Sequence, residues 1–144
     1  MTCRNLKFRC VLGGLLIGLS VSAHAQEQEQ LQGPTWVMVK FQSMDDSVMT
    51  PTRPADYTLT FEDRGRLRIR ADCNRGVAGW RSGNASELRI GHMVVTRALC
   101  MQGSMSTRFL RDLDFVRSYT FRDGHLFLAL KADAGIYEFR PMSQ

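Results

Sequence analysis

Residues 57–71 constrain the fold of this 144-residue chain more than any other segment, because apolar and polar side chains alternate there with a period of two. Residues 57–62 (YTLTFE) and residues 66–71 (RLRIRA) each place their apolar side chains on one face. Between them, Asp63-Arg64-Gly65 supplies a tight turn in which the glycine can adopt a positive φ. The pattern predicts an antiparallel β-hairpin that is buried on one face.

Further short strands flank this hairpin. The sequence predicts them at residues 36–41, 77–81, 87–90, 119–121, 126–130 and 136–139, and residues 93–95 continue the strand at 87–90 after a break at Gly91. Pro51 and Pro54 push the residues before them toward extended backbone, so residues 42–54 are expected to form a long loop. Most connections are too short for parallel crossovers, which favours an antiparallel sheet.

One helix is expected, at residues 101–117, because the period of the apolar side chains changes there. Phe109, Leu110, Leu113 and Val116 fall at helical spacing, and Ser104 or Ser106 is a plausible N-cap. The expected fold class is therefore α+β: a strongly curved antiparallel sheet or partial β-barrel of about seven or eight strands, with the helix closing one face or end.

The first 25 residues have the pattern of a cleavable export signal. Residues 1–9 carry three positive and no negative charges, residues 11–21 are apolar, and Ala23-His24-Ala25 has the small-x-small pattern of a cleavage site. The apolar run, of about 11 to 13 residues, is shorter than the roughly 20 that a membrane-spanning helix needs. Cys10 precedes this run, so no lipobox is present. We expect cleavage after Ala25 and a periplasmic or secreted protein.

The expected mature chain is one small domain. We assign residues 26–32 to a flexible leader and residues 33–142 to the domain, and no later segment reaches membrane-spanning length. Removal of the 25 signal residues leaves 119 of 144, enough for one domain and not for two.

The charge of the mature chain is nearly balanced. The signal takes three of the 19 Lys+Arg and none of the 14 Asp+Glu, which leaves 16 against 14 and a net charge of +2. This balance disfavours a highly charged disordered protein, and it is too small to favour nucleic acid as a partner.

Cys73 and Cys100 are the only cysteines of the expected mature chain. In an oxidising compartment a structural disulfide is the default expectation, and closing this loop would stabilise the fold by about 3.5 kcal/mol. Two alternatives stay open. One is a pair of unpaired or redox-active thiols, although no Cys-x-x-Cys is present; the other is a zinc site completed by His92 and His125.

Several elements around these cysteines resemble the META domain, the HslJ-like heat-shock family. Cys73-Asn74, followed by Gly76 or Gly79 and by Trp80, resembles the family's "GCN…G…Y" element, with Asp72 where the family usually has glycine. Residues 96–100, with Thr96 and Arg97 at their start, resemble its "T-[RK]-x-x-C" element, and residues 31–36, which end at Trp36, resemble its opening "L-x-G-x-x-W". Residues 109–113 and 126–128 resemble its closing helix and hairpin, so the resemblance covers residues 31–141.

The resemblance implies a small β-rich domain of the cell envelope that is linked to stress responses. It supplies no catalytic residues and no cofactor. Asn74 is interpreted as a structural residue, because Asn side chains favour tight turns by bonding nearby backbone.

The rest of the sequence offers little for catalysis. No nucleophile elbow or phosphate-binding glycine loop is present, His92 and His125 are isolated, and Asp45-Asp46 lies in a polar loop. We expect His125 to be exposed in a turn and His92 to be partly buried. The sequence therefore predicts a protein that is not an enzyme and holds no metal or cofactor.

Arginine is the unusual surface feature. The expected mature chain has 14 Arg and two Lys, and four of these arginines, Arg64, Arg66, Arg68 and Arg70, are spaced two residues apart. Such a stripe could contact an anionic envelope component through phosphate or carboxylate forks. The alternative is a solvated sheet face whose arginines pair with acids such as Glu62.

Two functions from different classes follow from these observations. The first is a non-catalytic envelope-stress domain that binds a protein or another envelope component. The second is a small-ligand-binding or inhibitor-like β-barrel with an apolar pocket formed by Trp36, Tyr57, Phe61 and Trp80. A small hydrolase is a third, less favoured possibility.

Overall fold

The structure is a computed structural model that describes residues 30–84 and 86–143. Its nine strands form one sheet in the order β6-β5-β4-β3-β1-β9-β8-β7, with the short β2 paired to β1. The strands are β1 (Thr35–Ser43), β2 (Val48–Met49), β3 (Tyr57–Glu62), β4 (Arg66–Ala71), β5 (Asn74–Ser82), β6 (Leu88–Val95), β7 (Val116–Arg122), β8 (His125–Leu130) and β9 (Gly135–Pro141). The expected signal peptide, residues 1–25, lies outside the described residues.

The hairpin predicted from alternation is confirmed. β3 pairs with β4 in an antiparallel register that runs from Tyr57 opposite Ala71 to Glu62 opposite Arg66. The turn between them, at Asp63–Gly65, is a short 3-10 turn in which Arg64 adopts a φ of 58°. The apolar side chains of both strands are buried, so the hairpin forms part of the core wall.

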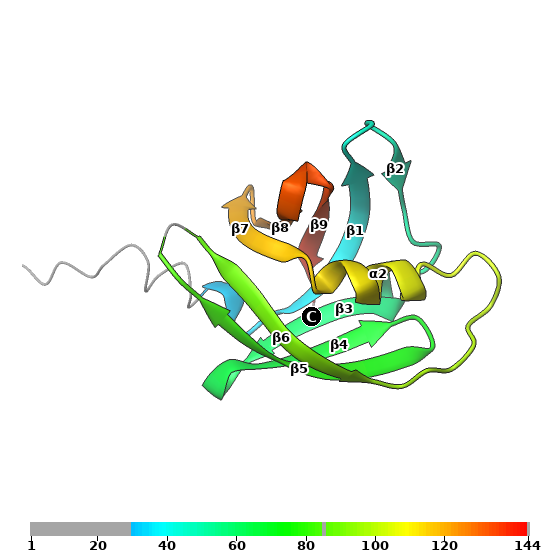
Figure 1. Cartoon of the computed structure of the whole chain (residues 1–144), viewed down its shortest axis with the longest axis horizontal. Helices are drawn as coiled ribbons and strands as arrows, with labels where there is room; N and C mark the ends of the chain where they lie inside the picture. The colour runs from blue at the N-terminus through cyan, green and yellow to red at the C-terminus, as the bar shows by residue number, and fades with distance from the viewer. Residues whose placement is uncertain (1–29, 85, 144) are drawn as a thin grey trace, which may run out of the picture.

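The sheet curls strongly and forms a partial barrel, as Figure 1 shows. All of its strand pairs are antiparallel. The curl brings the two edge strands, β6 and β7, toward each other, and the bridge between Glu87 and Ser118 joins them at one end. The expected α+β fold, with a curved sheet and one helix, is confirmed for the described residues.

The helix α2 spans Ser106–Leu113 and is shorter than the expected 101–117. Phe109 and Leu113 are fully buried, so the helix contributes one apolar face to the barrel interior. Val116, which has helical spacing in the sequence, belongs to β7, where it is buried as a strand residue. The N-cap is Met105, not Ser104 or Ser106.

Two expected strand boundaries were also wrong. The expected loop at residues 42–54 contains β2, which extends the hairpin of β1. The expected break at Gly91 is absent, because a shift in the β5–β6 register between Ala78 and Trp80 lets β6 continue to Val95. A bulge of this kind places one extra residue in a strand without ending it.

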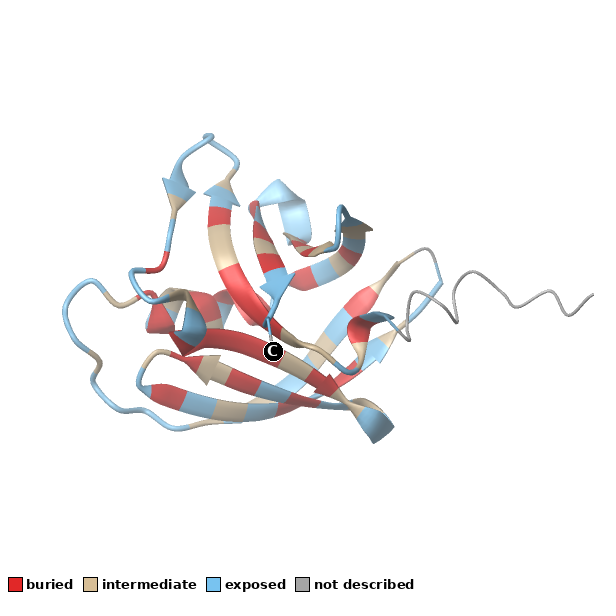
Figure 2. Ribbon diagram, turned by 180° about the vertical axis from the view of Figure 1, so that it is seen from behind, coloured by how far each residue is buried: buried red, intermediate tan, exposed pale blue. Residues whose placement is uncertain are grey.

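The core lies between the concave face of the sheet and α2, and Figure 2 shows buried residues alternating with exposed ones along the strands. Aromatic rings fill much of it: Phe109 of α2 packs against Tyr57, Tyr137 and Phe139. Leu31 is fully buried as well, so the folded domain already includes the last residues of the expected leader.

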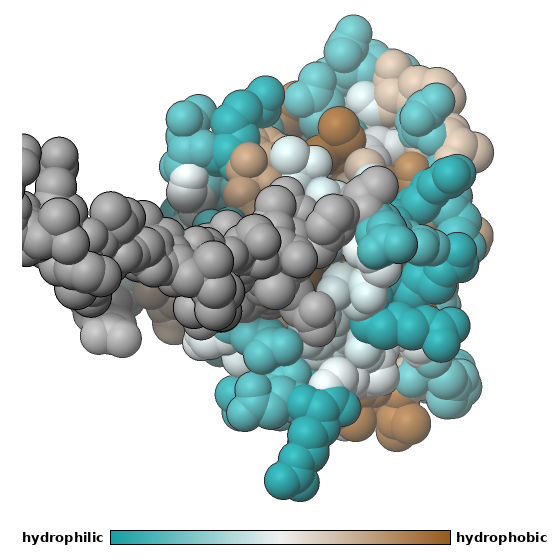
Figure 3. Space-filling view, turned by 90° about the vertical axis from the view of Figure 1, so that its left-hand side faces the viewer, coloured by the Kyte–Doolittle hydropathy of each residue, from teal (hydrophilic) through white to brown (hydrophobic). Residues whose placement is uncertain are grey.

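No helix among the described residues is long and apolar enough to cross a membrane. The face in Figure 3 carries several groups of hydrophilic side chains with smaller hydrophobic ones between them. Hydrophilic and hydrophobic side chains are thus mixed on the visible part of this face.

Candidate functional site

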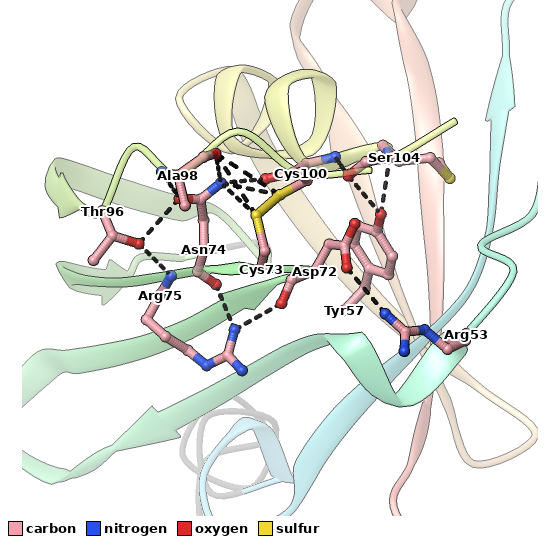
Figure 4. Close-up of a disulfide and its surroundings, with 12 residues drawn as sticks. Arg53, Tyr57, Asp72, Cys73, Asn74, Arg75, Thr96, Ala98, Cys100 and Ser104 are labelled. Atoms are coloured by element: carbon pink, nitrogen blue, oxygen red, sulfur yellow. Dashed lines mark hydrogen bonds and ion pairs between the residues drawn. A yellow bond between two sulfur atoms is a disulfide. The ribbon is translucent and has the colours of Figure 1, made fainter. Parts of the chain in front are cut away.

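The side chain of Asn74 is the centre of the motif region around the disulfide (Figure 4). Its Nδ2 donates to the Ala98 carbonyl and to Ser106 Oγ, both at 3.1 Å, and contacts Cys100 Sγ at 3.3 Å. Its Oδ1 accepts hydrogen bonds from Ala98 N at 2.7 Å and from Thr96 Oγ1 at 3.0 Å. Asn74 is buried at the start of β5, so these bonds fix the segment after β6 against the sheet and the helix.

The disulfide expected from the sequence is present. Cys73 and Cys100 are joined, with their Cα atoms 5.5 Å apart, and the bond lies directly beside Asn74 (Figure 4). Neither a free thiol pair nor a zinc site forms at these cysteines. The disulfide and Asn74 together hold residues 96–105, which we call the pinned loop, between β6 and α2.

The far end of the pinned loop is held by Tyr57. The Tyr57 hydroxyl accepts a hydrogen bond from Met105 N at 2.9 Å and lies 3.3 Å from Ser104 Oγ. Ser104 Oγ in turn accepts a bond from Ser106 N at 3.1 Å, which satisfies one of the unpaired amides at the start of α2. A core tyrosine therefore sets where the helix begins.

Asp72 stands where the resembled motif usually has glycine. Asp72 adopts a φ of 56°, in the left-handed region where glycine is favoured and aspartate is tolerated. Its carboxylate also lies 3.4 Å from Arg53, and its carbonyl accepts a bond from Arg75 at 2.7 Å. Aspartate at this position therefore adopts a backbone conformation that glycine adopts readily.

The two motif tryptophans are structural. Trp36 Nε1 donates to the Leu31 carbonyl at 3.0 Å, and Trp80 Nε1 donates to the Glu62 and Arg66 carbonyls at 3.2 and 3.1 Å. Both side chains are almost fully buried. Trp80 therefore closes the end of the β3–β4 hairpin.

The two motif glycines differ in their surroundings. A Cβ atom on Gly76 would lie 2.6 Å from Val95 Cγ1, whereas one on Gly79 would have Gly65 O at 3.9 Å as its nearest contact. Gly76 thus allows β5 and β6 to approach closely. Arg97, also from the motif, is exposed on the pinned loop.

The arginine stripe is only partly as expected. Arg66 and Arg68 of β4 both pair with Glu62, at 3.4 and 2.6 Å, and Arg70 pairs with Asp56. Arg64 lies in the turn before β4, outside the strand. The three strand arginines therefore already have carboxylate partners, and an anion contact at this stripe stays a prediction.

The isolated histidines are not assembled into a site. His92 is exposed rather than partly buried, and His125 lies in β8, where its Nδ1 is 2.7 Å from Glu138 Oε1. Residues 30–84 and 86–143 contain no group of three or more His, Cys, Asp or Glu side chains arranged to hold a metal ion.

A buried polar pair that the sequence did not indicate lies under α2. The Tyr137 hydroxyl donates to Asp112 Oδ2 at 2.9 Å, and Arg108 and Arg111 pair with the same carboxylate at 3.3 and 3.1 Å. Burial, followed by the charge of Asp112, raises the pKa of Tyr137 above its ordinary value of 10.0. This pair connects α2 to β9, and its only sequence signal is the spacing of Arg108 and Asp112 on one helix.

The fold and the motif region together define a small α+β domain in which a curled antiparallel sheet is closed by one helix and clamped by one disulfide. The chain belongs to the META domain family, whose model matches residues 29–142. The resemblance found in the sequence is therefore confirmed.

Solved structures share this fold at low sequence identity. An NMR structure of a protein from Burkholderia xenovorans has a TM-score of 0.68 at 18% identity, over 83% of this chain and 88% of that chain. The crystal structure of a DUF4847 family protein from Bacteroides vulgatus has a TM-score of 0.61 at 15% identity, over 82% and 99%. No curated protein matches the chain. At these identities the likeness concerns the fold alone.

Proposed function

We propose that this protein is an exported, non-catalytic domain of the cell envelope that takes part in a stress response by binding a protein partner. The proposal is supported by the export-signal pattern of residues 1–25, the disulfide between Cys73 and Cys100, and membership of the META domain family. The disulfide favours an oxidising compartment such as the periplasm.

The pinned loop carries the binding part of the proposal. Leu99 is fully exposed and Met101 nearly so, although both belong to a segment that Asn74 and the disulfide hold in place. Because the backbone that carries these apolar side chains is already fixed, it loses little conformational entropy on binding. Arg97 lies two residues before Leu99, so the loop suits a partner surface that is apolar at its centre and acidic at its edge.

Site-specific crosslinking tests the partner. A photo-crosslinking residue at Met101 should capture one defined protein in the intact envelope, and Leu99→Ala should weaken that capture by about tenfold or more. Met44→Ala is the matched control, because Met44 is an exposed apolar side chain in a different turn, between β1 and β2. Equal capture by the wild-type and Leu99→Ala proteins would contradict a role for the pinned loop.

Localisation is tested separately. Osmotic-shock release followed by intact-mass measurement should give a chain that begins at Gln26 and whose cysteines resist alkylation. An unprocessed chain with reactive thiols, retained in the cytoplasm, would refute export.

The stress role is tested by genetics. A deletion strain should grow poorly under heat or envelope stress, and the wild-type gene should restore growth better than a Leu99→Ala, Met101→Ala version. Full restoration of growth by the double variant would show that the stress role does not depend on the pinned loop.

A second candidate function is the binding of a small ligand. The apolar pocket expected for it is absent from the described residues, because its four side chains are packed into the core. Trp36, Tyr57, Phe61 and Trp80 are buried and packed against other rings, with Phe61 and Trp80 centroids 5.2 Å apart. A different site favours ligand binding: a surface hollow between the edge strands β6 and β7, described below.

A further inference from the structure

The barrel is open along a seam between its two edge strands. β6 and β7 are joined at one end by the Glu87–Ser118 bridge and by a hydrogen bond from Tyr119 N to the Ser86 carbonyl at 2.9 Å. Beside this junction, the surface has a hollow of about 410 Å³, which we call the seam hollow. Its walls come from the β3–β4 turn, β5 and β6 on one side and from the start of β7 and Lys131 on the other.

Glycines form part of the wall. Gly65, Gly79 and Gly91 line the seam hollow, and each lies near the backbone of a neighbour rather than near a side chain. A Cβ atom on Gly65 would lie 2.8 Å from the Trp80 carbonyl oxygen. Because these positions carry no side chains, the β3–β4 turn, β5 and β6 lie close together at this wall of the hollow.

The charged side chains around the seam hollow are mostly cationic. Arg64, Arg81, Arg89 and Lys131 line it, with Asp114 as the single acid among its lining residues. Arg89 pairs with Glu87 at 2.5 Å. Within the described part of the chain, Arg64, Arg81 and Lys131 have no ion pair, in contrast to the three arginines of β4.

One feature of this cluster is unfavourable without a ligand. Arg81 and Arg89 lie directly opposite each other on β5 and β6, and like charges at such a cross-strand position repel. Arg64, in the β3–β4 turn, has a φ of 58°, in the left-handed region that favours glycine.

We propose that the seam hollow binds a phosphate-bearing anion. A phosphate group carries up to two negative charges and three acceptor oxygens, which several converging guanidinium and ammonium groups can share. A single carboxylate would be satisfied by one arginine. The anion would remove the repulsion between Arg81 and Arg89. The phosphate can belong to a soluble molecule or to a lipid headgroup, and the proposal is independent of the pinned loop.

An NMR titration with inorganic pyrophosphate tests the site. Amide shifts should concentrate at Gly79 and Gly91, and Arg81→Gln should weaken binding about tenfold. Arg68→Gln is the matched control, because Arg68 is an arginine at a similar strand position that pairs with Glu62. Its affinity should match that of the wild type, and raising the salt concentration should weaken binding to both proteins.

A stability measurement shows whether the variants are folded, so that a loss of binding can be assigned to the site. Arg81→Gln should leave the melting temperature of the ligand-free protein unchanged or raised, because it removes the repulsion from Arg89. Arg64→Gly should behave likewise, since it removes a cation and relieves the positive φ. Pyrophosphate shifts spread over all arginines, or equal affinities of the Arg81→Gln and Arg68→Gln proteins, would overturn the proposal.

Vesicles identify the source of the phosphate. Binding to phosphatidylglycerol vesicles that is absent with phosphatidylcholine and lost in Arg81→Gln supports a lipid headgroup, whereas pyrophosphate binding without vesicle binding supports a soluble ligand. Leu99→Ala should leave both unchanged. The phosphate site and the pinned loop can therefore fail independently.

Discussion

At the scale of single residues, the Asn74 side chain satisfies backbone hydrogen-bonding groups of the pinned loop, as a neighbouring strand does elsewhere in the sheet. Its amide both donates to and accepts from the backbone of Ala98, at 3.1 and 2.7 Å. Backbone groups satisfied in this way do not need a strand partner, so residues 96–101 can be ordered and exposed together. The sequence indicated only a local turn for Asn74. The longer-range role was not visible there, because Ala98 lies 24 residues away in the chain.

The motif glycines give a matched pair of substitutions. Gly76→Ala should lower the free energy of unfolding by about 1–3 kcal/mol, because its Cβ would press on the branched side chain of Val95. Gly79→Ala should change it by about 0.5 kcal/mol or less, since that Cβ would make only an ordinary contact, with Gly65 O at 3.9 Å. Both substitutions restrict the unfolded chain equally, so urea denaturation of the two variants isolates the steric effect. Equal losses of unfolding free energy in the two variants would show that the close approach of β5 and β6 at Gly76 does not require a glycine.

Tyr137 makes stability depend on alkaline pH. Burial and the charge of Asp112 raise the pKa of Tyr137 above 10.0, so the folded state holds a proton that the unfolded state releases. Stability is therefore full below about pH 10 and falls above it, by up to about 1.4 kcal/mol per pH unit. Tyr137→Phe should remove this decline and lower stability near neutral pH by about 1–2 kcal/mol. Urea unfolding from pH 8 to 11 checks both effects, and parallel pH profiles would contradict them.

At the scale of elements, the pinned loop and α2 behave as one unit. Asn74 bonds both Ala98 of the loop and Ser106 of the helix, and Tyr57 bonds Met105 between them. The helix therefore begins where tertiary contacts end the loop, five residues later than the spacing of apolar side chains indicated. At its other end, Val116 has the spacing of a helix residue but pairs with Leu130 in the sheet.

Removal of the disulfide tests how this unit is held. Replacing Cys73 and Cys100 with serine should lower the free energy of unfolding by about 3.5 kcal/mol, mainly because the unfolded chain gains freedom. The loop should nevertheless keep its native shifts at Ala98, because Asn74 still holds it. Urea denaturation and NMR spectra of the folded variant measure the two effects. A loop that loses its native shifts while the sheet stays folded would show that the disulfide is the dominant restraint.

At the scale of the whole molecule, the partial barrel has two free edges joined at one end. Hydrogen exchange should be slowest in β1, β3 and β4, which lie inside the sheet, and faster in the β6 segment beyond Ile90 and in β7. Mass-spectrometric exchange on the purified domain measures this order. Protection of all of β6 equal to that of β3 would indicate a seam closed along its whole length. Pyrophosphate should slow exchange on both sides of the seam if it binds there.

Within the described residues, the sequence by itself predicted every strand except β2, one helix, a disulfide as the default state of Cys73 and Cys100, and the family. These features follow from local periodicity, from turn residues such as Gly65 and from the short motifs around Cys73. Tertiary structure alone decided the partners of the β4 arginines, the length of α2 and the position of Arg81 opposite Arg89. Those features depend on strand register and on how far the sheet curls, which bring together residues that are distant in the chain. The anion contact expected on one strand is for this reason proposed at the seam, where two ends of the sheet meet.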